Sequence, residues 1–249
     1  MRQIVISGND LWLERRGDTL SLPSSVALPS DGSGLFRFGP DGEYVAFQAP
    51  SVEIRAGLEL RGLRESHALL PADDYAAASK GAELIHWHAS MRYCPACGTL
   101  LRRGGPISKI CPACGSEHFP SLSPAVVVLV IRGREALLVH AANFRRPFYA
   151  LVAGFVETGE TLEQCVAREV REETTLEIDD IRYRGSQSWP FPAQLMLGFT
   201  ARYRAGEVTF ADGELTSGGF FSRDSLPMLP TPPSLSRALI DAWTRGDFD

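Results

Sequence analysis

The sequence lacks any run of about 18 consecutive apolar residues, the length that a membrane-spanning helix needs. Its first residues mix polar and apolar side chains and lack the basic-then-apolar layout of a signal peptide. A disulfide framework is also unexpected, because only five cysteines occur and no secretion signal accompanies them. We therefore expect a soluble, intracellular protein of the cytoplasm that does not insert into a membrane.

Excess positive charge is missing as well. Lys and Arg number 25 against 30 Asp and Glu, which gives a net charge of -5 and argues against a protein that coats nucleic acid non-specifically. Acidic residues are nevertheless absent from 84–116, a stretch that holds four cations: Arg92, Arg102, Arg103 and Lys109. This stretch is either a solvated loop surface or a phosphate-facing patch.

Apolar residues are plentiful, at 44% of 249 residues, so a packed core needs no help from disulfides. The pattern along the chain changes twice, near residues 90 and 120. We expect an N-terminal α+β domain over 1–90, a cysteine module over 91–120 and a second domain over 121–249.

The first domain alternates short apolar runs with turn-rich stretches such as 29–34. A long alanine-rich helix is expected to follow these runs at Ala72–Ser90. The expected strands cover Gln3–Ser7, Leu11–Leu13, Tyr44–Gln48 and Leu58–Leu63.

The last domain has stronger strand signals. The apolar run AVVVLVI at Ala125–Ile131 is typical of a strand buried on both faces, and Gly133-Arg134 offers a hairpin turn after it. A C-terminal helix is expected at Ser234–Arg245, with Ser234 as its cap. The further expected strands cover 136–141, 148–153, 181–188, 195–203 and 220–221.

The cysteine module repeats the motif CPACG, with thirteen residues between the two pairs. Two residues between cysteines let one turn present both thiolates to the same ion, and the glycine that follows permits the positive φ of a metal knuckle. Four thiolates fill a tetrahedral shell, so we expect one structural Zn²⁺ per chain, with a redox dithiol or plain buried cysteines as the alternatives. The expected ligands are Cys94, Cys97, Cys111 and Cys114. The fifth, Cys165, is expected to be a free buried thiol.

A carboxylate-bearing helix gives the most information about function. Thr161 and Gln164 form a capping box, so a helix should begin there. One face of this helix carries Glu169, Glu172 and Glu173, and like charges four residues apart repel one another. Hard divalent cations, Mg²⁺ or Mn²⁺, are natural partners for such carboxylates. The bland alternative is an ordinary acidic surface helix.

The glycine-rich loop and the spacing that follows it resemble the Nudix box: Gly154, five residues, Glu160, seven residues, then Arg168-Glu169-Val170-Arg171-Glu172-Glu173. The resemblance implies an α+β fold in which a mixed sheet is sandwiched by helices, and hydrolysis of a nucleoside diphosphate linked to another group. It also implies that Glu169 and Glu173 ligate the metal with the Ala153 carbonyl and that Glu172 assists. Arg168 lies eight residues after Glu160, about two helical turns, a spacing that favours a structural ion pair between loop and helix over catalytic roles.

One position departs from the box. The family has glycine two residues after the last glutamate, where this chain has Thr175. A β-branched residue at positive φ costs about 1–2 kcal/mol, so we expect this helix to end differently and the activity to be lower.

Residues 186–192, SQSWPFP, resemble the SQPWPFP signature of the NADH pyrophosphatase branch of the Nudix hydrolases, which also has a four-cysteine zinc ribbon. The prolines hold Trp189 and Phe191 rigidly, which suits a flat base or nicotinamide site, although these aromatics could equally belong to a core. The resemblance implies that Phe155 stacks on a base, that Phe119 stacks from a partner subunit in a homodimer, that Glu214 is a further metal ligand and that Ser236 lies near the substrate. The implied substrate-binding stretch is Gln187, Ser188, Trp189, Pro190, Phe191, Pro192, Ala193 and Gln194.

The sequence therefore predicts metal-dependent hydrolysis of the NADH or NAD⁺ pyrophosphate to nicotinamide mononucleotide and AMP. The same chemistry would remove an NAD cap from RNA, with the basic cysteine module as a candidate RNA contact. Two alternatives stay open: a Nudix hydrolase of ADP-ribose or dinucleoside polyphosphates, and a non-catalytic nucleotide- or RNA-binding module.

Overall fold

Two units make up the computed structural model, which describes residues 1–29, 34–49, 57–144, 146–210 and 213–248. The first unit comprises Met1–Leu122 together with Trp189–Ala193, and the second comprises Ser123–Ser188 and Gln194–Asp249. Most of the turn-rich stretch 29–34 lies outside the described residues. Among the described helices, none combines the length and apolar character that crossing a lipid bilayer takes.

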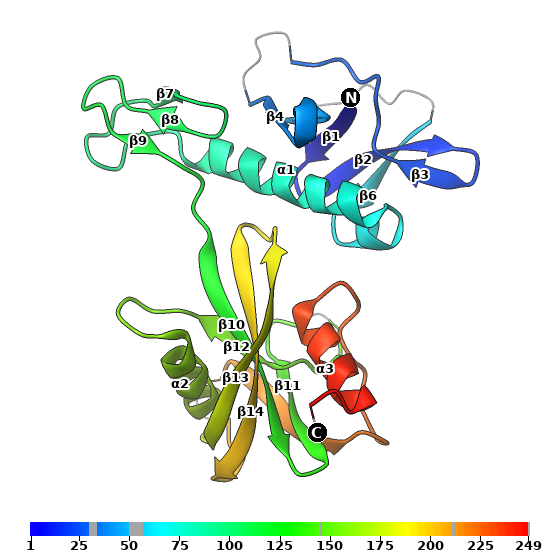
Figure 1. Ribbon diagram of the computed structural model, residues 1–249, viewed down its shortest axis with the longest axis vertical. Coiled ribbons are helices and arrows are strands. Elements are labelled where there is room, and N and C mark those ends of the chain that lie inside the picture. The colour runs from blue at the N-terminus through cyan, green and yellow to red at the C-terminus, as the bar shows by residue number, and fades with distance from the viewer. Residues whose placement is uncertain (30–33, 50–56, 145, 211–212, 249) are drawn as a thin grey trace. The chain divides into compact units, whose positions relative to one another are not determined.

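The first unit is built on a six-stranded sheet in the order β3-β2-β1-β5-β4, with β6 pairing with β2. Its strands are β1 (Arg2–Ser7), β2 (Asp10–Arg16), β3 (Thr19–Ser21), β4 (Phe36–Phe38), β5 (Tyr44–Gln48) and β6 (Leu58–Gly62). Short 3-10 helices occur at Pro40–Gly42 and Glu65–Ala68. The predicted helix is confirmed as α1 (Ala72–Ser90), which lies across this sheet (Figure 1).

Helix α1 packs closely on the sheet at Gly81. A Cβ atom at that position would lie 2.8 Å from Ile4 Cγ2 and 2.9 Å from Ala46 Cβ, so only glycine permits the contact. Leu84 and Trp87 extend the buried face of the helix into the same core. Sheet and helix together form the predicted N-terminal α+β region.

The cysteine module follows α1 and has a small three-stranded sheet, β7 (Arg102–Arg103), β8 (Lys109–Ile110) and β9 (Glu117–His118). Each strand has only two residues. Lys109 joins the module to α1: its Nζ donates to the carbonyls of His88 and Met91, at 2.7 Å each, and lies over the Trp87 ring. This lysine is 6% exposed and therefore acts as a buried cap of the helix end.

The second unit has a mixed sheet in the order β13-β14-β10-β11-β15, with β12 pairing with β10. Strand β10 runs parallel to β14 and antiparallel to β11 and β12. The strands are β10 (Ser123–Arg132), β11 (Glu135–Ala141), β12 (Val152–Phe155), β13 (Glu177–Trp189), β14 (Gln194–Ala205) and β15 (Leu215–Ser222).

Helices cover both faces of this sheet. Alternate side chains of β10 enter two cores: Val126 and Val128 pack with α2 (Leu162–Thr174), whereas Val127 and Leu129 pack with α3 (Leu235–Arg245). Figure 1 shows α2 and α3 on opposite sides of the strands. The predicted helix-sheet-helix sandwich is confirmed.

One strand lies elsewhere than predicted. The apolar run 148–153 was expected to form a strand throughout, but β12 begins only at Val152. Ala150 makes an isolated bridge to Val139 of β11 instead, and pairing with β10 starts only at Val152. Apolar composition alone does not place such a boundary.

Candidate active site and metal centre

The four cysteines of the repeated motif come together in one cluster. Their Sγ atoms all lie within 4.8 Å of one another, and no other described group of side chains is gathered in this way. Cys94 and Cys114 are 3.7 Å apart, and Cys97 and Cys111 are 3.5 Å apart. A tetrahedron with metal-sulfur bonds of about 2.3 Å has sulfur atoms about 3.8 Å apart, so the cluster has the size of a tetrahedral zinc site.

Two side chains beyond the cysteines support this cluster. Ser116 Oγ lies 3.1 Å from Cys114 Sγ and 3.4 Å from Cys94 Sγ, and His118 Nε2 lies 3.0 Å from Ser116 Oγ. The hydrogen bond with Ser116 lowers the pKa of Cys94 to about 5, which favours the thiolate that a metal requires. The sequence analysis missed both residues, although polar side chains directly after the second knuckle are a usable signal.

The basic stretch around the cysteines is less open than predicted. Lys109 is the buried helix cap described above, so it is neither solvated nor available to a phosphate. Arg103 Nη1 donates to the Leu35 carbonyl at 2.7 Å and Nη2 to the Pro106 carbonyl at 3.3 Å. Of the four predicted cations, Lys109 and Arg103 are therefore hydrogen-bonded to backbone carbonyls, and Arg92 lies over the Tyr93 ring.

The carboxylate helix α2 begins with the predicted capping box: the Thr161 side chain accepts from Gln164 N, and the Gln164 side chain accepts from Thr161 N. Its apolar stripe buries Val166, Val170 and Cys165, and burial raises the pKa of the Cys165 thiol to about 12. Cys165 is thus the predicted free, buried thiol.

Glu169 points from α2 onto the backbone of β12. A Cβ atom at Gly154 would lie 1.9 Å from the Glu169 carboxyl carbon, so the glycine leaves space for that carboxylate. The Ala153 carbonyl belongs to the adjacent residue of the same strand. Burial raises the pKa of Glu169, and the charges of Glu172 and Glu214 raise it further, while hydrogen bonding to Arg168 opposes them.

Arg168 lies at the centre of the acids. It contacts Glu160 through two hydrogen bonds, Nε to Oε2 at 3.1 Å and Nη2 to Oε1 at 2.7 Å, which confirms the predicted structural pair. Its Nη1 also donates to Glu169 at 2.8 Å and to Glu172 at 3.0 Å. The sequence analysis did not foresee these two contacts, although the four-residue spacing of Arg168 and Glu172 signals one of them.

The remaining acids come from different elements. Glu173 is 6% exposed on α2, and Glu214 directly precedes β15, where its carbonyl accepts from Ala142 N at 2.8 Å. The carboxylates of Glu169, Glu172, Glu173 and Glu214 provide the hard oxygen donors that Mg²⁺ and Mn²⁺ prefer.

The helix exit at Thr175 corrects a prediction. Helix α2 does end in the left-handed conformation, with Thr175 at φ 59° and ψ 11°. The Thr175 hydroxyl donates to the Glu207 carbonyl at 2.7 Å, and the Thr209 hydroxyl lies 2.9 Å away. These contacts hold a β-branched residue in a conformation that normally favours glycine.

The stretch Gln187–Gln194 is divided between the two units. Gln187 lies in the second unit, where its side-chain oxygen accepts from Leu235 N at 2.7 Å and its amide donates to the Pro233 carbonyl. It thereby fixes the first turn of α3, next to Ser236, whose Oγ accepts from Leu151 N at 3.2 Å. Ser188 is exposed on β13, and Gln194 begins β14 opposite Ser123.

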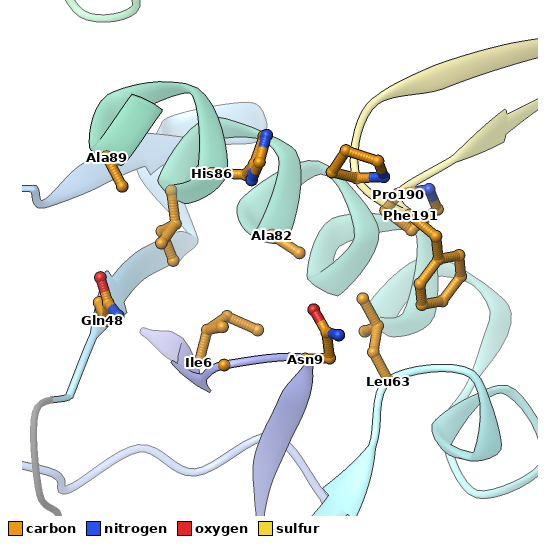
Figure 2. Close-up of a pocket in the computed structure, with 12 residues that line it drawn as sticks. Ile6, Asn9, Gln48, Leu63, Ala82, His86, Ala89, Pro190 and Phe191 are labelled. Atoms are coloured by element: carbon orange, nitrogen blue, oxygen red, sulfur yellow. The ribbon is translucent and has the colours of Figure 1, made fainter. Parts of the chain in front are cut away.

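The loop Trp189–Ala193 belongs to the first unit. The Arg64 guanidinium carbon lies 4.8 Å from the Trp189 ring centroid and 4.9 Å from that of Phe191. Pro190, Phe191 and Pro192 also border a cavity of about 140 Å³ beside α1, whose lining includes Ile6, Leu63 and His86 (Figure 2). Nothing in the sequence predicted the contact of Arg64 with these rings.

Both aromatic side chains predicted to stack are open to solvent. Phe155, at the end of β12, is 53% exposed, and Phe119, near the end of the cysteine module, is 56% exposed. Exposed aromatic rings of this kind are available for stacking.

Comparison with known proteins places these features in one family. Residues 121–241 match the family model described as NUDIX domain. A protein of Chromobacterium violaceum named NAD-capped RNA hydrolase NudC is 38% identical over 96% of this chain and 90% of its own length. Proteins with the same name from Vibrio vulnificus (36% identical, 95% of this chain and 90% of that protein) and Deinococcus radiodurans (38%, 90% and 81%) are also similar.

Among solved structures, a NUDIX hydrolase from Nitrosomonas europaea superposes with a TM-score of 0.53. The match covers 62% of this chain and 91% of that chain, at 23% identity. This likeness concerns the fold.

Proposed function

Since this chain belongs to the Nudix hydrolases, in the family of NAD-capped RNA hydrolases, we propose that it hydrolyses the pyrophosphate bond of NADH and NAD⁺. Water adds across the bond and gives AMP and nicotinamide mononucleotide, in reduced form from NADH. The same reaction removes an NAD cap from RNA. The similarity over nearly the whole length of named NAD-capped RNA hydrolases supports this assignment.

The observation that carries the proposal is the position of Glu169. Its carboxylate lies against the β12 backbone at Gly154, within the electrostatic field of Glu172 and Glu214. Burial raises the pKa of Glu169, and the charges of Glu172 and Glu214 add to this effect, so a divalent cation would stabilise the charged carboxylate there. An acidic surface helix without a function would not need this glycine.

We assign Glu169, Glu173, Glu214 and the Ala153 carbonyl as ligands of Mg²⁺ or Mn²⁺. When bound, such cations neutralise charge on a pyrophosphate and activate water for attack on phosphorus. Glu172 assists these ligands from the solvent side, since its side chain is 53% exposed. Arg168 holds Glu160, Glu169 and Glu172 in place and so orients the acids.

Substrate contacts are assigned to the aromatic residues and to the stretch from Gln187 to Gln194. Phe155 stacks on a base, because its exposed ring directly follows Gly154, against which the Glu169 carboxylate lies. Trp189 and Phe191 are held by Arg64, while Gln187 acts by fixing the first turn of α3 beside Ser236. Ser188, Pro190, Pro192, Ala193 and Gln194 complete this part of the proposal.

We assign a structural Zn²⁺ to Cys94, Cys97, Cys111 and Cys114. The closed set of four thiolates leaves no position for a substrate, so this ion stabilises the fold and does not take part in the reaction. Phe119, which follows the ribbon, supplies a stacking ring to the partner subunit in a homodimer. The exposure of its ring supports this role.

The test is hydrolysis of NADH with Mg²⁺ or Mn²⁺, followed as AMP release. Glu173→Gln should lower the rate by about a hundredfold or more, because it removes one charged ligand from the site. Glu163→Gln is the matched control: the same substitution on the same helix, at an exposed position outside the acid row. Unfolding temperatures of both variants verify that buried Glu173 is not simply required for folding.

Substrate preference follows from the same assay with NAD⁺, ADP-ribose, dinucleoside polyphosphates and NAD-capped RNA. Faster turnover of ADP-ribose or of dinucleoside polyphosphates would replace the proposed substrate within the same enzyme class. No metal-dependent hydrolysis of any of them would refute catalysis and leave a binding module.

A further inference from the structure

A recess in the second unit gathers arginine side chains far along the sheet from the acids of α2. It has a volume of about 180 Å³ and lies between β13, β14 and the residues that follow α3. The residues of its lining that matter here are Asp180, Arg182, Arg184, Thr200, Arg202 and Phe248.

The arginines share one face of the sheet. Gly198 of β14 contacts Leu235 and Leu239 of α3, so its alternate neighbours Thr200 and Arg202 also face the α3 side. Arg184 Nε donates to Thr200 Oγ1 at 2.8 Å and therefore belongs to this face. The recess thus opens on the side of the sheet opposite α2.

Carboxylates balance only part of this positive charge. Asp180 accepts from Arg182 Nε at 2.8 Å and pairs with Arg202 Nε at 3.2 Å, so one acid serves two guanidinium groups. The hydrogen bond from Arg182 lowers the pKa of Asp180, and the charges of Arg202 and Arg184 lower it further. Asp247, the other acid of the lining, pairs with Arg245 at 2.8 Å.

Arg184 is the guanidinium best placed for a ligand. Within the described part of the chain it takes part in no ion pair; its Nε donates to Thr200 and its Cζ lies 4.6 Å from the Phe248 ring centroid. These two contacts fix the orientation of the group while its remaining N–H donors stay available. Planar guanidinium forks of this kind suit the oxygens of a phosphate.

We propose that Arg182, Arg184 and Arg202 form a phosphate-binding recess that takes a backbone phosphate of RNA. This inference rests on the proposed function: the cap of an NAD-capped RNA occupies the acid site, and the RNA that follows it reaches the α3 side of the sheet. The recess would then increase affinity for capped RNA without touching the scissile bond.

The openness of the recess favours a polymer over a small enclosed anion. The side chains of Arg182 and Arg202 are 60% and 70% exposed, so a phosphate on a continuous chain can reach them without the protein opening. Local positive charge is also distinctive on a chain whose net charge is -5. Because the binding of single-stranded RNA is largely electrostatic, its affinity should fall as the salt concentration rises.

The experiment measures the affinity of a short, uncapped, fluorescently labelled single-stranded RNA at several salt concentrations. Arg184→Gln/Arg202→Gln should raise Kd about fivefold or more, and reduce the slope of log Kd against log salt by about 0.7, the value for one lost phosphate contact. Arg134→Gln/Arg204→Gln is the matched control, because both of its arginines are exposed in the second unit and neither lines the recess.

Equal losses of RNA affinity in both double variants would mean that net charge alone governs RNA binding. An unchanged Kd in Arg184→Gln/Arg202→Gln would mean that RNA does not use the recess. Either result overturns the proposal. A second measurement, thermal stabilisation by inorganic phosphate, separates a free anion from RNA. Loss of that stabilisation in the recess variant with unchanged RNA affinity would overturn the assignment to RNA. Arg202→Gln alone serves as the less invasive variant if the double variant unfolds.

Catalysis is measured separately, so the two proposals can fail independently. NADH hydrolysis should be unchanged in the recess variant, whereas the KM for a capped RNA long enough to reach the recess should rise with kcat retained. A wild-type protein without hydrolytic activity would refute the proposed function, while the affinity for uncapped RNA would still decide the recess.

Discussion

The Arg168 guanidinium faces the Glu160 carboxylate, with Nε and Nη2 donating to its two separate oxygens at 3.1 and 2.7 Å. Glu160 Oε1 also accepts from Glu157 N at 2.7 Å, so this carboxylate fastens the loop that precedes α2 to the helix itself. The same arginine donates to Glu169 and Glu172. The loop and the proposed metal ligand Glu169 are therefore held by the same arginine.

The Glu160 pair predicts a specific acid sensitivity. Hydrogen bonding to Arg168 lowers the pKa of Glu160 to about 2, from a usual value near 4.5. A lowered pKa in the folded state contributes stability above the usual value, and that contribution is lost as the pH falls from about 4.5 towards 2. Glu160→Gln should therefore be less stable than wild type near pH 7, with the difference shrinking through this acid range.

Urea unfolding at a series of pH values measures this difference. Glu163→Gln, an exposed position one residue inside α2, is the control and should follow the wild-type curve. A stability difference between wild type and Glu160→Gln that is the same at pH 7 and pH 2.5 would contradict the role of the ion pair.

Gly154 is predicted to be required for the position of Glu169. A Cβ atom there would lie 1.9 Å from the Glu169 carboxyl carbon, so Gly154→Ala must displace the carboxylate. Because a displacement of about 1 Å at a reacting centre can cost about a hundredfold in rate, we expect a loss of that order in NADH hydrolysis, with the fold retained. Gly219→Ala in β15 is the control, since a Cβ there meets nothing within 4 Å. Full activity in Gly154→Ala would remove Glu169 from the proposed ligands.

The sequence predicted correctly the elements that depend on residues close together in the chain. A short apolar run places β5 and alanine content places α1 at their observed bounds, and the capping box at Thr161 places the start of α2. Repeated spacing predicted the cysteine cluster, since two knuckles of the same kind can close on one ion. These features depend on residues only a few positions apart.

Features that depend on distant contacts were not predictable in this way. Lys109 was grouped with the other cations of its stretch, yet the end of α1, about twenty residues earlier in the chain, buries its ammonium group. Arg64 contacts the rings of Trp189 and Phe191, and no residue near Arg64 in the sequence predicts this contact. β12 begins where its pairing with the distant strand β10 begins, at Val152. In each case the tertiary partner decides the role of the residue.

Thr175 should tolerate glycine better than valine. The left-handed conformation costs a β-branched residue about 1–2 kcal/mol, and the hydrogen bond from its hydroxyl to Glu207 returns about 1 kcal/mol. Thr175→Val keeps the strain and loses the bond, so it should destabilise by about 1 kcal/mol or more. Thr175→Gly loses both and should remain within about 1 kcal/mol of wild type. Chemical denaturation ranks the three proteins, and a glycine variant less stable than the valine variant would refute this account.

Ser116 should determine how firmly the cysteine cluster holds its metal. Its hydroxyl lies near the sulfurs of Cys94 and Cys114, and His118 Nε2 lies 3.0 Å from the hydroxyl and 3.7 Å from Cys94 Sγ. Groups that hydrogen-bond to metal ligands commonly change metal affinity about 10- to 100-fold, so Ser116→Ala should release zinc to a chelator about tenfold faster. Ser90→Ala is the control, because that hydroxyl bonds only to carbonyls of its own helix.

Chelation tests the structural role itself. Complete removal of the metal with a strong chelator should unfold the ribbon and, with it, remove the cap that Lys109 places on α1, since a closed thiolate site contributes directly to folding. The expected result is loss of near-ultraviolet dichroism and a lower unfolding temperature, both restored by added Zn²⁺. If the metal-free protein kept both signals, the four cysteines would not be a structural zinc site. If Ser116→Ala and wild type released zinc at equal rates, the zinc assignment would stand and only the role of the Ser116 hydroxyl would be refuted.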